Sequence, residues 1–163
     1  MVVKRIITGF LGIVVLGALA LIIFGGNSDL DIVRAATEGL QTVEAAQAAG
    51  HVNVNVDGCV ASPEGAMGYH YVNFDLVDLE LDPDKPEIMV FVPDEEGGIR
   101  LGAVEYAVPI DAWDANNDVL PTVLGQTLHP NPELGLYVLH AWIYEENPSG
   151  VFADWNSNVA CLG

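Results

Sequence analysis

The sequence predicts an α+β fold, with one leading amphipathic helix and a mainly antiparallel β sandwich or barrel, preceded by an N-terminal transmembrane or signal segment. Two patterns predict the domain. Apolar residues recur every three or four positions from Leu30 to Ala46, as on the buried face of a helix. After Gly50 the spacing changes to two, and short alternating segments separated by turn residues follow.

Residues 1–26 are predicted to be a signal peptide or a membrane anchor, and residues 27–163 a single extracytoplasmic domain. Lys4 and Arg5 precede an uncharged run from Ile6 to Phe24. At about 19 residues, this run is long enough to cross a hydrocarbon core as a helix. The basic residues place the N-terminus inside and the remainder outside the cytoplasm. A small-x-small sequence within the run allows cleavage, but apolar residues continue beyond it, so both outcomes stay open.

The domain is expected to begin with one helix between Ser28 and Gly50. Gly39 weakens its middle, and Gly50 ends it. The segment from His51 to Val56 alternates strictly, which predicts a strand with its valines in the core and His51 facing out. Further strands are expected at 67–73, 87–92, 99–108 and 136–144, with a hairpin turn at 93–98 and a short helix around Trp113.

The charge of the chain excludes one class of partner. Five basic residues stand against 23 acidic ones, and the net charge is −18. Such a surface repels phosphate backbones, so no nucleic acid is expected to bind. The expected partner is a membrane, through the N-terminal segment, while a small-molecule or protein partner stays open.

The two cysteines, Cys59 and Cys161, predict a disulfide, because an even cysteine count in an exported chain is typical of one. The alternative is a pair of thiolate metal ligands. Neither cysteine belongs to a CxxC unit, which argues against that alternative.

Three histidines and a glutamate are candidate metal ligands. His70 lies between two tyrosines, His129 precedes a proline, and His140 lies in the middle of an apolar strand. Glu105 interrupts another apolar strand, where an ionised carboxylate must find a partner or raise its pKa. Such a set can hold Zn, Cu, Fe or Mn. No HxH, HxxxH or HExxH spacing is present, so the ligands must converge through the fold. For each histidine taken singly, an ordinary core or surface position with hydrogen-bond partners is favoured.

Two function hypotheses follow. The first is an extracytoplasmic domain that binds a transition metal through these four residues; an open coordination position would then activate water or dioxygen if the protein is an enzyme. The second is a non-catalytic cell-surface module that binds a small ligand or a protein through aromatic side chains. It predicts scattered histidines and an exposed apolar patch. No serine lies in GxSxG and no phosphate-binding loop is present, so no catalytic residue is assigned.

Several motifs resemble those of one family. They are MGYHYVN at 67–73, LHAW at 139–142 and NPSGVFADWN at 147–156. Through them the chain resembles an uncharacterised family of exported microbial proteins, over most of the domain and including both cysteines. The resemblance implies export and a shared fold but no reaction.

Overall fold

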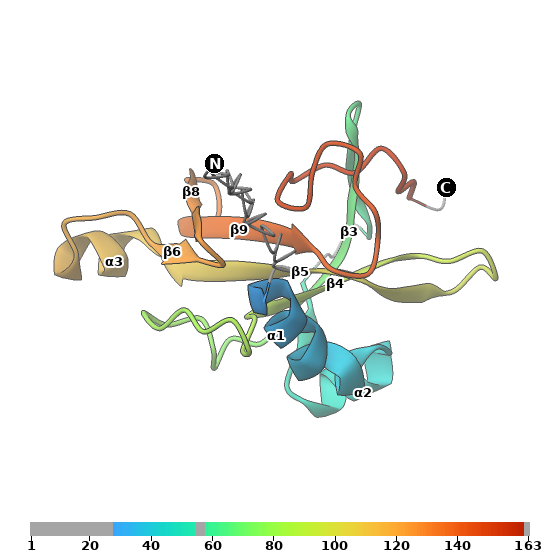
Figure 1. The fold of residues 1–163 in the computed structure, drawn as a ribbon, viewed down its shortest axis with the longest axis horizontal. Coiled ribbons are helices and arrows are strands. Elements are labelled where there is room, and N and C mark those ends of the chain that lie inside the picture. Colours follow the sequence, from blue (N-terminus) through green and yellow to red (C-terminus); the bar gives the residue numbers. More distant parts are fainter. Residues whose placement is uncertain (1–27, 55–57, 162–163) are drawn as a thin grey trace, which may run out of the picture.

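The computed structural model describes residues 28–54 and 58–161, and its centre is an antiparallel sheet (Figure 1). In order across the sheet, the strands are β1 (Val52–Asn53), β3 (Gly65–Val72), β4 (Ile88–Pro93), β5 (Ile99–Pro109), β9 (Leu136–Trp142) and β8 (His129–Asn131). A further strand, β2 (Val60–Ser62), pairs with β3, while β6 (Thr122–Val123) and β7 (Gln126–Thr127) pair with each other. The expected α+β class is confirmed. Across the described residues the strand order runs as an open path, and a closed barrel is not shown.

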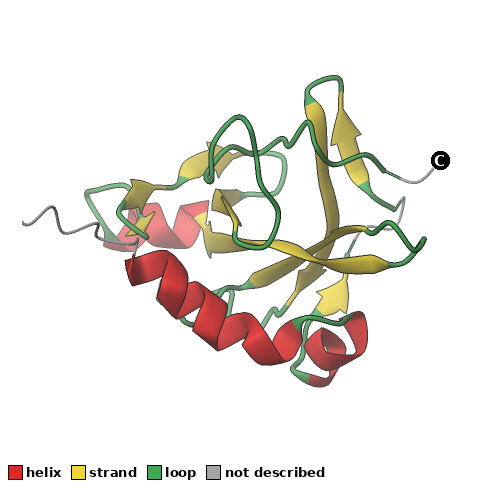
Figure 2. Cartoon of the chain, turned by 45° about the vertical axis from the view of Figure 1, so that its right-hand side comes forward, coloured by secondary structure: helices red, strands yellow, loops and turns green. Residues whose placement is uncertain are grey.

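The two faces of the sheet are covered by different parts of the chain. The helices α1 (Ser28–Thr37), α2 (Val43–Ala48) and α3 (Ile110–Asn116) contribute to the core on one face. The C-terminal part of the chain passes over the other face (Figures 1 and 2). Because side chains alternate along a strand, each central strand contributes to both cores. That explains why β4 and β5 are almost continuously apolar and buried.

The predicted single helix is interrupted. After α1, a 3-10 turn spans Glu38–Leu40, and α2 begins after Thr42, whose Oγ1 accepts a hydrogen bond from the backbone of Ala45 at 3.2 Å. A glycine within the turn lowers the helix propensity there, and Thr42 caps a new helix. Gly50, with φ at 97°, follows α2 as expected.

The predicted orientation of the segment after Gly50 was wrong. His51 is buried, at 3% exposed, whereas Val52 is 48% exposed. The ring Nδ1 of His51 lies 3.3 Å from the carbonyl oxygen of Ala46, under the end of α2, and burial lowers the pKa of the ring. Alternation shows which residues share a face, but the docking of α2 decides which face is buried.

The other predicted elements are confirmed within a few residues. The expected hairpin joins β4 to β5, and the backbone of Asp94 donates to the carbonyl oxygen of Gly98 at 3.0 Å. The carboxylate of Asp94 also accepts a hydrogen bond from the backbone N–H of Gly98 at 2.7 Å. The carboxylate of Asp94 therefore helps to hold the turn together.

The chain from Asn147 to Val159, called the strap below, is fixed on the sheet face opposite α1 and α2. The indole Nε1 of Trp142 donates to Ala153 at 2.7 Å. The backbone of Asn156 exchanges two hydrogen bonds with Ala66 of β3, both at 3.1 Å. The strap is therefore tied to both β9 and β3.

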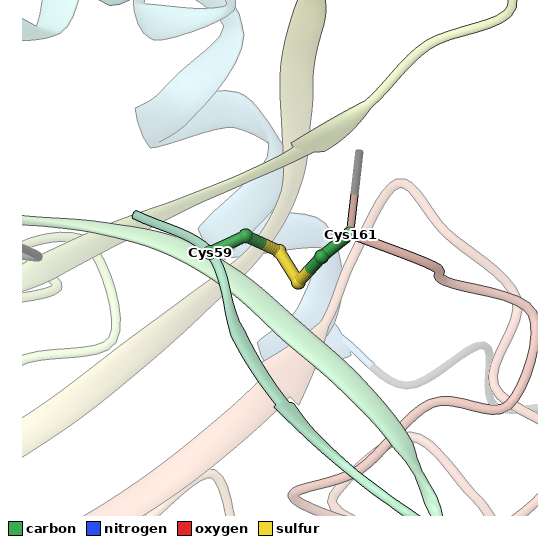
Figure 3. Close-up of a disulfide and its surroundings, with 2 residues drawn as sticks. All are labelled: Cys59 and Cys161. Atoms are coloured by element: carbon green, nitrogen blue, oxygen red, sulfur yellow. A yellow bond between two sulfur atoms is a disulfide. The ribbon is translucent and has the colours of Figure 1, made fainter. Parts of the chain in front are cut away.

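The predicted disulfide between Cys59 and Cys161 is confirmed. It joins the chain before β2 to the chain after the strap, with 5.6 Å between the two Cα atoms (Figure 3). It indicates an oxidising environment outside the cytoplasm, in agreement with predicted export. The export segment itself, residues 1–26, lies outside the described residues. Within the described part of the chain, none of the helices is long and apolar enough to cross a membrane.

Glu87, which the sequence did not single out, is a buried acid with a structural role. It is 1% exposed, and its Oε2 accepts a hydrogen bond from the backbone of Ala107 at 3.1 Å. Burial raises the pKa of this carboxyl to about 8. The side chain is therefore protonated at neutral pH, and it pairs with a backbone donor of β5 next to the start of β4.

The Glu87→Gln variant should be more stable than the wild type at high pH. Because the folded-state pKa of Glu87 lies above its ordinary value, folding binds the proton, and stability falls as pH rises from about 4.5 to about 8. Glutamine stays neutral and keeps an acceptor for Ala107. We expect equal unfolding free energies near pH 5 and a difference on the order of 2–4 kcal/mol at pH 9, measured by urea unfolding. Parallel pH profiles for the two proteins would contradict the assignment.

Candidate metal centre

Three of the four predicted ligands converge below the strap. One ligand atom from each of His70, Glu105 and His140 lies within 4.8 Å of those of the other two, and all three residues are buried. These residues are called the buried cluster below. They come from β3, β5 and β9, which are far apart in the sequence.

Strand register explains the convergence. Glu105 lies directly opposite His140 in the pairing of β5 with β9, so their side chains leave the same face of the sheet as neighbours. His70 reaches them from β3 across β4. Two residues earlier, Gly68 has φ at 118°, and a Cβ there would overlap the carbonyl oxygen of Phe91. Glycine is therefore required where β3 approaches β4 beside the cluster.

His140 is the least usual member of the cluster. It is 0% exposed, and neither of its ring nitrogens has a hydrogen-bond partner among the described residues. Its ring is 4.9 Å from that of Trp142 and 6.1 Å from that of His70, measured between centroids. A buried polar group without a partner costs about 1–3 kcal/mol, so it needs a physical explanation. A metal ion bound through the ring lone pair would supply one.

The electrostatics leave the cluster neutral at neutral pH. Burial lowers the pKa of His70 to about 4. The pKa of His140 falls to about 3, through burial and then through the positive charges of His70 and His129. Burial raises the pKa of Glu105 to about 8, with a further contribution from the negative charge of Asp154. Both imidazoles are therefore in the neutral, metal-binding form, and the carboxyl carries a proton that a metal ion would displace.

The spacing of the cluster suits a metal better than a hydrogen bond. The Nε2 of His70 lies 3.6 Å from Oε2 of Glu105, beyond ordinary hydrogen-bond length. Two ligand atoms on a tetrahedral ion with bonds of about 2.0–2.1 Å are themselves about 3.4 Å apart. Two imidazoles and a carboxylate can hold Zn, Fe, Mn or Cu.

His129, the fourth predicted ligand, lies outside the buried cluster. It lies on β8 opposite Val138, on the sheet face that carries His140, and its side chain is 47% exposed. Its Nε2 is 3.3 Å from Oδ2 of Asp154, in the strap. Sequence reasoning did not find Asp154, because nothing in its spacing distinguishes it from the many other acids of this chain.

Two cavities of the described structure lie elsewhere. One of about 400 Å³ is lined by the turn between β2 and β3 and by the end of the strap, including Pro63 and Val159. The other, of about 150 Å³, lies between α1 and the loop before β4, and is lined by His51 and Lys85 among others. Neither of these two cavities is lined by the buried cluster or by a phenylalanine, tyrosine or tryptophan.

Comparison with known proteins adds no assignment. No family model, curated protein or solved structure matches the chain. The resemblance to exported microbial proteins stays a prediction. What the molecule binds must therefore be argued from the geometry of its own residues.

Replacing His140 by leucine should stabilise the metal-free protein. Leucine has a similar size and removes two buried nitrogens that lack partners, so we expect the unfolding free energy to rise by about 1–3 kcal/mol. Urea unfolding at pH 7 in the presence of a chelator measures this. The His129→Leu variant is the control, and should change stability by less than about 0.5 kcal/mol because this side chain is half-exposed. A destabilised His140→Leu protein would show that the ring makes favourable polar interactions without metal.

Proposed function

We propose that this domain binds one divalent transition-metal ion through His70, Glu105 and His140. The observation that carries the proposal is the fully buried imidazole of His140, which has no hydrogen-bond partner among the described residues and lies opposite a buried carboxyl. Buried polar groups in native proteins are nearly always paired. A cation bound by both rings and the carboxylate would give the ring of His140 the partner that it lacks among the described residues.

The donor set selects the class of metal. Two neutral imidazoles with one carboxylate suit zinc, iron, manganese or copper, whereas magnesium and calcium prefer oxygen ligands alone. Three protein ligands leave at least one position for water or another small ligand. The net charge of −18 also raises the local concentration of cations at the surface of this protein.

The buried position of the cluster supports a role in holding the metal. The ion would join β3, β5 and β9 beneath the strap, and would stabilise the folded state in proportion to its affinity and concentration. Neither described cavity opens on the cluster, so the proposal includes no reaction and no catalytic residue.

We further propose that the domain works outside the cytoplasm, tethered to or released from a membrane by residues 1–26. The disulfide between Cys59 and Cys161 supports this location, because such bonds persist in oxidising compartments. The apolar segment that follows Lys4 and Arg5 supports the route of export.

The full chain, purified without a histidine tag, should contain about one equivalent of a transition metal after reconstitution. Elemental analysis after gel filtration measures this. His140→Leu should lose the metal, because one of three ligands is absent, while His129→Leu should retain it. Failure of the wild type to retain zinc, copper, iron or manganese would sink the proposal.

Metal binding should release about one proton per ion between about pH 5 and pH 8. The proton comes from Glu105, whose pKa burial raises to about 8. His70 and His140 release none in this range, since their pKa values are lowered to about 4 and about 3. Apparent affinity should therefore rise about tenfold per pH unit and level off above pH 8.

Calorimetric titration in two buffers of different ionisation enthalpy counts the released protons. The Glu105→Gln variant keeps the shape of the site without the titrating group, so its metal binding should be weaker and release no proton. Two or more protons released by the wild type at pH 6 would contradict the assignment, because the imidazoles would then be titrating in their ordinary range.

A further inference from the structure

His129 and Asp154 form a second pair of metal-binding side chains beside the buried cluster. His129 lies opposite Val138, and His140 is two residues further along β9 on the same face. Diagonal neighbours of this kind lie within reach of long side chains. Asp154 contacts His129, and its negative charge also contributes to the raised pKa of Glu105.

The pair differs from the cluster in its access to solvent. The side chains of His129 and Asp154 are 47% and 32% exposed, whereas those of His70 and Glu105 are each 10% exposed. The chain around Asp154 is fixed, because the preceding carbonyl accepts the indole hydrogen bond of Trp142. An ion at this pair would therefore be in contact with solvent and next to the cluster.

The spacing of the pair fits an ion. Nε2 of His129 and Oδ2 of Asp154 are 3.3 Å apart, an ion-pair distance that is also close to the separation of about 3.4 Å between two ligands of a tetrahedral metal. Two ligands hold an ion weakly, since most of its coordination sphere is still water. Such a pair can capture an ion and pass it on.

We propose that His129 and Asp154 form the entry pair through which a divalent cation reaches His70, Glu105 and His140. This inference rests on the proposed metal site. An entry pair stabilises the ion during passage in both directions, so it speeds association and dissociation by the same factor. A fourth ligand, by contrast, would stabilise the bound state and slow dissociation alone.

Stopped-flow mixing of the metal-free full chain with Co²⁺ tests the proposal. The readouts are visible absorption and the quenching of tryptophan fluorescence, because the ring of Trp142 lies beside His140. Asp154→Asn and His129→Ala should each lower the association and dissociation rate constants by about tenfold, with the dissociation constant unchanged within about threefold. Glu146→Gln is the charge-matched control, because it removes one exposed negative charge next to the strap, and it should leave both rate constants unchanged.

Four outcomes would overturn the inference. Unchanged rate constants in both variants would show that the ion enters elsewhere. A larger dissociation constant with an unchanged association rate constant would make Asp154 or His129 a ligand of the bound ion. If the wild type binds no Co²⁺ and no other transition metal, the proposed metal site does not exist, and there is then no entry route to it. If only the variants fail to bind, the metal site stands and the pair belongs to it.

Discussion

The pairing of β5 with β9 is the interaction on which both the fold and the buried cluster depend. It runs from Ala103 opposite Trp142 to Pro109 opposite Leu136, through the middle of the sheet. Its register aligns Glu105 with His140 and turns both toward the strap. A slip of one residue between the two strands would put these side chains on opposite faces of the sheet, one of them among the apolar residues that pack under the helices. The hydrophobic pattern of the two strands therefore specifies the cluster as well as the core.

Burial gives the cluster its chemistry and its cost. The same loss of hydration that lowers the pKa of His70 and His140 raises that of Glu105, so no member is charged at neutral pH. Neutral imidazoles are ready to bind a metal, but without one they reduce the stability of the fold. Glu87 shows the contrast, because its buried carboxyl has a backbone donor and serves the sheet alone. His140, which has no such partner among the described residues, therefore indicates a function better than Glu87 does.

The sequence predicted much of this arrangement, for local reasons. A glutamate inside an apolar strand and a histidine between apolar neighbours are visible without a structure, and both proved buried. The orientation of His51 was not predictable, because alternation does not say which face meets α2. The break in the helix after Thr37 was not predicted either, because the helical spacing of apolar residues continues across it. Asp154 and Glu87 were not singled out, because the chain has many acidic residues. Only their neighbours in the folded structure distinguish these two from the others.

By itself the sequence determined the α+β class, the acidic surface, the pairing of the two cysteines and the residue types available to a metal. These follow from the composition, from the periodicity of apolar residues and from the number of cysteines, which are local or additive properties of the chain. Only the tertiary structure decided that His70, Glu105 and His140 meet while His129 remains at the surface with Asp154. Convergence depends on strand order, on register and on the path of the strap. These are set by packing between segments far apart in the chain, and no spacing within one segment records them.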